Sequence, residues 1–300
     1  MAQFAFYLLY VLSWLPLWFL YAASTLLSLI AHYLVRYRLS VVEQNIAMSF
    51  PEKSRKERQR IIRGYYRHMG DLLMEALYNL RATPDQIKRH YHIVNREILD
   101  RIYEHGQSAV LISSHYNNWE YMVAGLNILF LHHGIGVGKP LQDKRFGKLL
   151  TRQRTRYGTE VVDQTNVRET IAYYEQHHVP CAYMLLSDQC PSNSYKSYWT
   201  TFLHQETPFL YGAEYFARKY ALPVVYYEVH KVHRGQYDVV FELLSENGAA
   251  EEPYAIEQRY VDRLEKLLQS KPDYWLWSHR RWKRSRPAEV PIHTPLSQTI

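Results

Sequence analysis

Cysteine is nearly absent from this 300-residue chain, which has only Cys181 and Cys190. Two cysteines cannot build a disulfide framework or a cysteine-rich zinc site, and they fit a reducing compartment. The chain also has no glycine-rich phosphate loop and no His-Glu-x-x-His pattern of the zinc proteases. We therefore expect no metal and no cofactor. Beyond the N-terminal segment, the chain has the length of one ordinary domain of about 260 residues.

Charge is missing from the first 35 residues, which contain no Asp, Glu, Lys or Arg. This leucine-rich stretch is long enough for a membrane-spanning helix, which needs about 20 residues. It lacks a positive n-region and its apolar part is too long for a secretory signal. We interpret residues 1–38 as a retained membrane anchor and residues 39–300 as the main domain; a buried core helix of a soluble domain is the alternative. Pro16 can kink the helix or split it into a re-entrant pair, which leaves the number of crossings open.

Positive charge is clustered along the chain, which has a net charge of +7. Basic residues follow the apolar segment from Arg36 onward, and this asymmetry predicts that the main domain faces the cytoplasm. A second cluster lies between Lys139 and Arg156, and a third follows Trp277 near the end of the chain. Lysine, arginine and tryptophan together suit an anionic membrane surface. They also suit nucleic acid, but next to a hydrophobic anchor we expect lipid phosphate and no nucleic acid.

The segment from Ser113 to Glu120 carries the most informative chemical pattern. It follows the apolar run 109–112, which is typical of a buried strand. His115 at the end of a strand can act as a general base toward a hydroxyl group. We expect the Glu120 carboxylate to hold the other ring nitrogen and to stabilise the imidazolium. One His and one Glu at this spacing also occur by chance, and the chain has fifteen histidines.

The order of apolar segments predicts a layered α/β domain with a mostly parallel sheet flanked by helices. In such sheets, sites collect beyond the carboxyl ends of the strands, where both His115 and Asp188 fall. Ser54 is expected to cap the first helix of the main domain, and Asn117 or Asn118 the helix after His115. The expected helices are 54–80, 84–104, 118–131, 143–157, 166–177, 207–220 and 253–270. The expected strands are 109–114, 134–138, 159–162, 181–186, 223–231 and 237–244, of which the last two pair with each other.

Several short motifs follow one another in a specific order. They are His115-x4-Glu120, Lys139-Pro140-Leu141-Gln142-Asp143, Arg154-x3-Gly158, Asp188-Gln189, the set Phe202, Thr207, Gly212 and Ala217, and the closing run Tyr274–Lys283 with Trp277-Ser278-His279-Arg280-Arg281-Trp282-Lys283.

Over nearly its whole length, the chain resembles the late acyltransferases of lipid A biosynthesis, within the lysophospholipid acyltransferase superfamily. It departs from the family pattern at Lys139, where the family usually has Arg, at Asp143, where it has Asn, and at Leu203-His204, where it has Phe-Gly. A lysine cannot offer the planar fork of an arginine. These departures concern the acceptor more than the reaction, because the His-x4-Glu pair is intact.

The resemblance implies transfer of a fatty acyl group from a thioester, acyl-carrier protein or acyl-CoA, to a hydroxyl of a lipid A precursor at the bacterial inner membrane. His115 and Glu120 would be catalytic. Arg154, or backbone amides at the start of the 118–131 helix, would hold the oxyanion. Lys139, Asp188 and Thr207 complete the expected substrate-binding set.

Three alternatives remain open at this point. The acceptor could be a lysophospholipid or an amino-acid-headed lipid instead of a glycolipid. Water could replace the alcohol, which would make the protein a hydrolase. The chain could also be a non-catalytic lipid-binding membrane protein of the same fold.

Overall fold

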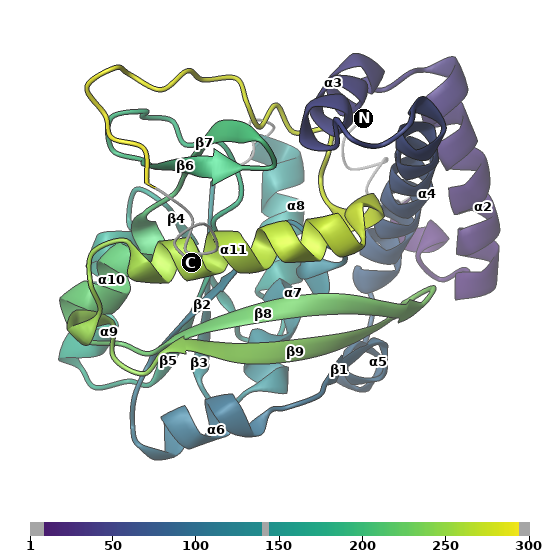
Figure 1. The fold of residues 1–300 in the computed structure, drawn as a ribbon. Helices are drawn as coiled ribbons and strands as arrows, with labels where there is room; N and C mark the ends of the chain where they lie inside the picture. The colour runs from purple at the N-terminus through teal and green to yellow at the C-terminus, as the bar shows by residue number, and fades with distance from the viewer. Residues whose placement is uncertain (1–8, 140–143, 294–300) are drawn as a thin grey trace.

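A seven-stranded, mostly parallel sheet lies at the centre of the computed structural model, with helices on both faces (Figure 1). The structure describes residues 9–139 and 144–293. The strands of the sheet are β1 Tyr91–Ile93, β2 Ala109–Ser113, β3 His133–Gly138, β4 Glu160–Asp163, β5 Cys181–Leu186, β8 Val224–His233 and β9 Gln236–Ser245, and a separate hairpin consists of β6 Tyr198–Phe202 and β7 Gln205–Phe209. The helices are α2 Leu17–Leu29, α3 Leu39–Ser49, α4 Arg55–Asn79, α5 Pro84–His90, α6 Glu97–Glu104, α7 Trp119–Leu129, α8 Lys144–Arg154, α9 Val167–Gln176, α10 Gly212–Tyr220 and α11 Ala255–Ser270, with short helical turns η1 Ile30–Leu34, η2 Gly248–Ala250 and η3 Pro272–Tyr274.

The strand order is β1-β9-β8-β2-β5-β3-β4. Every neighbouring pair is parallel except β8 and β9, which form the predicted antiparallel pair. The predicted α/β fold with a mostly parallel sheet is therefore confirmed. The strands β2, β5 and β3 are neighbours in the middle of the sheet, so their carboxyl ends open onto the same edge.

Strand β2 divides the hydrophobic core into two parts. Val110 and Ile112 belong to the core on the side of α9, α10 and α11. Ala109 and Leu111 belong to the core on the side of α5, α6 and α7. A strand that is buried on both faces reads as a continuous apolar run, which is the pattern that the sequence has there.

Helix starts follow the capping signals of the sequence. Ser54 and Glu57 form a capping box, in which each residue accepts from the backbone N–H of the other. The predicted cap at Ser54 is therefore confirmed. The hydroxyl of Thr83 caps α5 in the same way. Of the two candidates at the start of α7, Asn118 is the cap, because its side chain accepts from the N–H of Tyr121.

The predicted helix 84–104 is wrong as a single element. It is interrupted after His90 by β1, which pairs in parallel with residues 237–239 of β9. Tyr91 is buried there between Tyr121 and Tyr237. Pairing with the edge of the sheet outweighs the helical pattern of the local sequence, because propensity is only a weak prior against tertiary contacts.

The predicted helix 207–220 is also wrong in its first third. Residues 205–209 form β7, which pairs with β6, and the helix α10 begins at Gly212. The hairpin turns at Leu203 and His204, which both have a positive φ. Such turns usually contain Asn or Gly, so the local sequence carried no signal of this hairpin.

The N-terminal helix α2 packs along α4 in the opposite direction (Figure 1). Ser24 contacts Asp71, and further along, His32 stacks on Tyr66. The two backbones approach closely at Gly70, where an added Cβ would lie 2.8 Å from the carbonyl oxygen of Ser24. Within the described residues, Leu17–Leu34 is the one helical stretch long and apolar enough to cross a membrane, with a mean hydropathy of 1.5.

Candidate active site

The adjacent strands β2 and β5 bring His115 and Asp188 together. Ser113 lies opposite Leu186 in the register of the two parallel strands, and each functional residue follows its strand by two positions. The Nδ1 atom of His115 lies 2.6 Å from Oδ1 of Asp188. The backbone N–H of His115 also donates to Oδ2 of Asp188, at 3.0 Å. The predicted location beyond the carboxyl ends of the strands is confirmed.

The carboxylate of Asp188 is almost fully buried, with 2% of the residue exposed. The indole Nε1 of Trp275 donates a further hydrogen bond to its Oδ2, at 2.8 Å. Burial raises the pKa of Asp188, but the neighbouring His115 and the hydrogen bonds outweigh burial and hold this pKa below its ordinary value. Asp188 is therefore an ionised carboxylate, which accepts hydrogen bonds and donates none.

The contact with Asp188 determines which ring nitrogen of His115 carries the proton. Because a carboxylate only accepts, Nδ1 of His115 must donate, and Nε2 then has a free lone pair. The side-chain amide of Gln189 donates to this Nε2, at 3.2 Å. Trp119 packs edge to face on the ring, and 17% of the His115 side chain remains exposed. A neutral imidazole with its lone pair on Nε2 is the form that a general base requires, and an acceptor hydroxyl would take the place of the Gln189 amide there.

Glu120 does not hold the ring of His115, so that prediction is wrong. Its carboxylate accepts two hydrogen bonds from Arg154, from Nε at 2.9 Å and from an Nη atom at 2.5 Å. It also accepts from the indole of Trp119, at 3.1 Å. Glu120 lies in the first turn of α7 and faces α8, whereas the loop before α7 turns His115 toward β5. The pairing of β2 with β5, which no local spacing reveals, selects Asp188 as the partner.

A cavity of about 740 Å³ opens beside His115. Its volume lies within the range of ligand-binding pockets, about 300–1,000 Å³. Polar groups of His115, Lys139, Arg154 and Gln189 line part of it. The apolar part of its lining includes Val123, Val137, Val161, Val167, Met184, Leu185 and Phe216. Such a cavity can hold an alkyl chain with polar groups near one region of its wall.

The other predicted site residues are distributed unevenly around this cavity. Lys139 and Arg154 line it. Thr207 does not: it is buried in β7, where its hydroxyl donates to the carbonyl of Gln205 and accepts from the indole of Trp282. The remainder of the Lys139 motif, residues 140–143, lies outside the described residues.

The loop that carries His115 is held by the C-terminal segment. Asn117 adopts a left-handed conformation with φ 52°, which asparagine tolerates better than most residues. Its backbone N–H donates to the carbonyl of Tyr274, at 3.0 Å, and its side-chain amide donates to the carbonyl of Val229, at 2.6 Å. The preceding residue, Tyr116, forms a bridge with Trp275. The imidazole is therefore attached to a fixed backbone.

Two of the C-terminal tryptophans correct an expectation from the sequence. Trp275 and Trp277 are buried in the core, so they cannot face a membrane surface. Arg281 is buried as well and donates to the carbonyl of Pro208. The motif around them packs against the candidate site, where the indole of Trp275 donates a hydrogen bond to Asp188. A buried indole N–H needs a hydrogen-bond partner. The composition of the motif does not show which of its tryptophans are buried and paired in this way.

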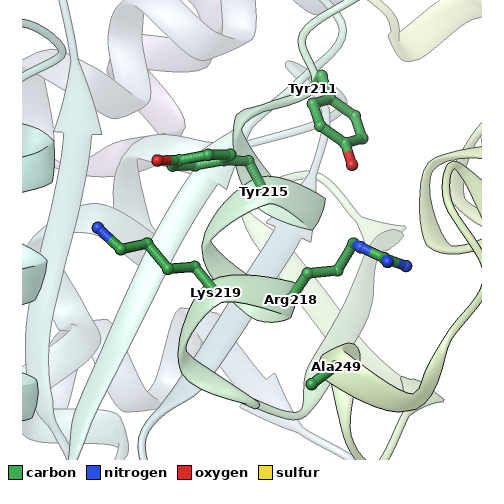
Figure 2. Close-up of a pocket in the computed structure, with 5 residues that line it drawn as sticks. All are labelled: Tyr211, Tyr215, Arg218, Lys219 and Ala249. Carbon is green, nitrogen blue, oxygen red and sulfur yellow. The ribbon is translucent and has the colours of Figure 1, made fainter.

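A smaller recess of about 290 Å³ is lined by Tyr211, Tyr215, Arg218, Lys219 and Ala249 (Figure 2), and the two tyrosines also line the larger cavity. Arg218 and Lys219 extend from α10 in different directions there. Arg218 donates to the backbone carbonyl of Glu251. No histidine or carboxylate lines this recess, so the candidate active site is the larger cavity with His115.

Comparison with known proteins identifies the family. A family model described as bacterial lipid A biosynthesis acyltransferase matches residues 2–284. No curated protein matches the chain well enough to be counted as a relative. Because the match covers nearly the whole chain, the chain belongs to this family and is an acyltransferase. The family implies an acyl donor and a lipid acceptor in a membrane context.

Proposed function

We propose that this acyltransferase moves a fatty acyl group from acyl-carrier protein to a hydroxyl of a lipid A precursor, with His115 as the general base. One observation carries the proposal. His115 is held at Nδ1 by the buried Asp188, and its ring lines a largely apolar cavity of about 740 Å³. Acyl-CoA, which is also a thioester, is the alternative donor of the acyl group.

The reaction needs one proton transfer in each direction. Nε2 of His115 removes the proton of the acceptor hydroxyl while the hydroxyl oxygen attacks the thioester carbonyl. The tetrahedral oxyanion then collapses, the carbon–sulfur bond breaks and the thiolate takes the proton back from Nε2. The products are an ester and a free thiol. Asp188 keeps the imidazole in the required tautomer and stabilises its cation in between, as the carboxylate of a catalytic triad does.

Arg154 is the proposed ligand for negative charge in this cavity. Glu120 occupies two of the N–H donors of its guanidinium group. Its remaining donors make no hydrogen bond to the residues that the structure describes, and in this proposal they bind an oxyanion or a phosphate of the acceptor. In this proposal Glu120 is a positioning residue, because it acts through Arg154. Lys139, on the lining of the cavity, supplies a second positive charge toward an anionic headgroup.

The membrane context of the family and the apolar helix α2 support attachment to the cytoplasmic face of the bacterial inner membrane. A lipid acceptor would then reach the cavity from the bilayer, and the acyl chain would lie against the apolar lining. The proposed division into an anchor, 1–38, and a catalytic domain, 39–300, places the chemistry entirely in the second part.

The test uses the full-length protein in lipid nanodiscs, with acyl-carrier protein that carries a radiolabelled acyl group as the donor. The acceptors are a lipid A precursor that lacks a late acyl chain, and, in parallel, a lysophospholipid. We expect transfer to the first acceptor. His115→Ala should lower the rate by at least about 10²-fold. The matched control, His92→Ala, removes a histidine that is mostly exposed on β1 and should leave the rate unchanged.

Two outcomes would contradict the proposal. Near-normal transfer by His115→Ala would remove His115 as the base. Transfer to the lysophospholipid alone would keep the base and replace the acceptor.

A further inference from the structure

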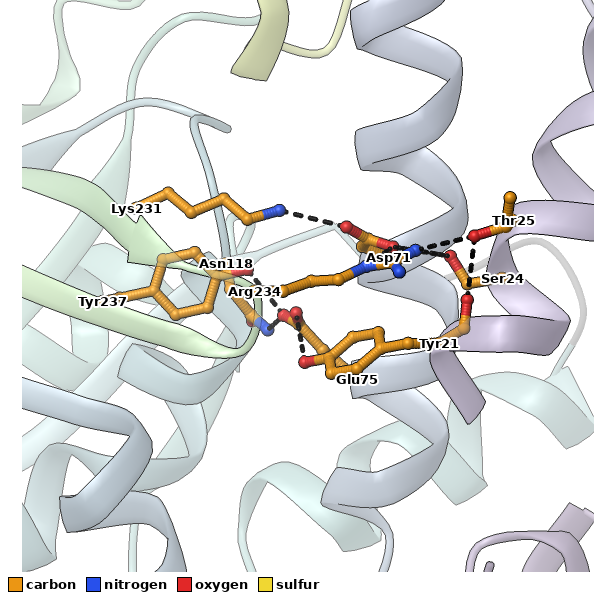
Figure 3. A network of polar contacts seen from close by, with 9 residues as sticks. All are labelled: Tyr21, Ser24, Thr25, Asp71, Glu75, Asn118, Lys231, Arg234 and Tyr237. Atoms are coloured by element: carbon orange, nitrogen blue, oxygen red, sulfur yellow. Dashed lines mark hydrogen bonds and ion pairs between the residues drawn. The ribbon is translucent and has the colours of Figure 1, made fainter. Parts of the chain in front are cut away.

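The N-terminal helix α2 carries a line of polar side chains on the face that it turns toward the sheet domain (Figure 3). Tyr21 donates to the buried Glu75, at 3.0 Å, and Ser24 donates to Asp71, at 2.6 Å. Thr25 accepts from Arg234, at 3.1 Å. These contacts occupy the middle of the helix, so its inner face is committed to the rest of the protein.

The partners of this polar line are charged groups of the sheet domain. Asp71 of α4 is paired with Lys231, at 3.0 Å, and with Arg234, at 2.6 Å, both from the β8–β9 hairpin (Figure 3). Gly235, at the tip of the same hairpin, leaves no room for a side chain beside the ring of Tyr21. Helix α2 is therefore flanked along its length by α4 and at its middle by the tip of the hairpin.

These neighbours decide whether α2 can cross a bilayer. Leu17–Leu34 has 18 residues, a length of about 27 Å, so a crossing would need nearly all of it inside the hydrocarbon core. Helix α4 would then enter the core beside it, together with the exposed Arg63 and Arg67. The ionic cluster around Asp71 would follow. Charged groups at that depth are strongly disfavoured.

The outer face of α2 is apolar from end to end. Its exposed residues follow one another at helical spacing, and the most exposed are Trp18, at 72%, and Leu26, at 61%. The outer line consists of Trp18, Ala22, Leu26 and Leu29 of α2, and Tyr33 of η1 continues it. Because the polar face of α2 is bound to the protein, only this apolar line is left to contact lipid.

The charge around α2 points to anionic lipid. No acidic residue precedes Glu43 in the sequence, and Arg36 and Arg38 follow the helix directly. Positive residues next to an apolar face with tryptophan suit the interface of a membrane that contains anionic phospholipids.

We propose that α2 lies in the plane of one membrane leaflet, with its apolar line in the lipid and its polar line on the protein, and does not cross the bilayer. The inference concerns attachment alone and does not depend on the acyl-transfer chemistry. It predicts that the residues before and after α2 are on the same side of the membrane.

The first test measures topology in inverted inner-membrane vesicles, which expose their cytoplasmic face. The full-length chain carries an N-terminal epitope tag and the substitution Glu52→Cys, whose position is exposed. A protease should remove the tag, and an impermeant maleimide should label the cysteine, both without detergent. Protection of the tag until detergent is added, with Glu52→Cys labelled, would show a crossing and overturn the proposal.

The second test measures binding to vesicles of phosphatidylethanolamine and phosphatidylglycerol. Leu26→Glu should weaken sedimentation with these vesicles at least tenfold and leave the melting temperature in detergent unchanged. Leu131→Glu is the matched control, because Leu131 is 51% exposed on another part of the molecule. It should bind as the unchanged protein does. Equal binding by both variants, or equal loss by both, would overturn the assignment of this face to the membrane.

Discussion

Two buried carboxylates lie on either side of the start of α7, and each accepts three hydrogen bonds. Asp188 accepts from the backbone and ring of His115 and from Trp275. Glu75 accepts from Tyr21, from Asn118 at 2.6 Å and from Tyr237 at 2.7 Å. The pKa of Asp188 is lowered, whereas burial raises the pKa of Glu75 despite its hydrogen bonds.

The difference lies in the donors. Asp188 faces an imidazole that can become a cation and that lines an open cavity, so in the proposed reaction its negative charge would stabilise that cation during proton transfer. Glu75 faces neutral hydroxyl and amide groups inside a closed core, where it joins α4 to α2, α7 and β9 (Figure 3). The same number of hydrogen bonds therefore serves the proposed chemistry at Asp188 and the packing of helices against the sheet at Glu75.

The largest expected effect is a loss of activity, which should distinguish Asp188 from Glu75. Asp188→Asn should lower kcat by about 10²–10⁴-fold, because the amide neither fixes the tautomer of His115 nor stabilises its cation. Glu75→Gln should lower kcat by less than about tenfold, since Glu75 contacts no group that reacts. Steady-state kinetics in nanodiscs would measure both. A comparable loss of kcat in the two variants, with both proteins folded, would erase the distinction.

The second prediction separates them by stability. Glu75→Ala leaves Tyr21, Asn118 and Tyr237 without their acceptor in the core. The free energy of unfolding should fall by about 3 kcal/mol or more, because each buried unsatisfied donor costs about 1–3 kcal/mol. Chemical denaturation in detergent would measure it. Glu52→Ala, at an exposed position, is the control and should change stability by no more than about 0.5 kcal/mol. Equal stability of the two variants would show that the Glu75 network does not join the helices.

The third prediction concerns the pair of hydrogen bonds between Arg154 and the carboxylate of Glu120. Arg154→Lys loses the two parallel hydrogen bonds to Glu120, because a lysine ammonium is a single point donor. We expect kcat/KM to fall by about tenfold, which corresponds to about 1.4 kcal/mol. Arg152→Lys changes an exposed residue of the same helix and should have no effect. If both variants keep full kcat/KM, the fork of Arg154 has no role in the reaction.

The smallest expected effect is a difference in pH dependence. The raised pKa of Glu75 makes the folded state bind its proton more tightly than the unfolded state, so its contribution is greatest at low pH and declines as pH rises above 4.5. Relative to Glu75→Gln, the unchanged protein should therefore lose stability between about pH 5 and pH 7.

The opposite sign holds for Asp188. Its pKa lies below 3.8, so its contribution is complete above that pH and is lost only as pH falls through the lowered value. The stability difference between the unchanged protein and Asp188→Asn should therefore shrink as pH falls below 3.8. Denaturation curves at several pH values test both statements. A flat difference for Glu75→Gln between about pH 5 and pH 7 would contradict the first statement, and a difference for Asp188→Asn that does not shrink below pH 3.8 would contradict the second.

Much of the fold was predictable because its signals are local. The apolar run of β2, the cap of α4 at Ser54 and the cap of α7 at Asn118 each depend on residues within a few positions of one another. The short strand β1 was missed because only its pairing with β9 makes it a strand. The β6–β7 hairpin was missed because its turn at Leu203 and His204 contains none of the usual turn residues.

The candidate site was predictable as a place and not as a set of contacts. His115 and Asp188 were expected at the same edge of the sheet, since both follow buried strands. Their direct hydrogen bond depends on β2 and β5 being neighbours, and strand order does not follow from local sequence. Glu120 and Thr207 were assigned by their motif, and the structure gives the first to Arg154 and the second to Trp282.

The sequence by itself determined most of the helices and of the strands in the main sheet, the apolar helix near the N-terminus and the candidate histidine, because hydrophobic period, capping and motif spacing act over a few residues. Tertiary structure alone decided which carboxylate holds that histidine, and which face of α2 stays exposed. Both outcomes depend on side chains that are distant in the chain. The interactions between these side chains form, and contribute free energy, only once the sheet and α4 have brought them into contact.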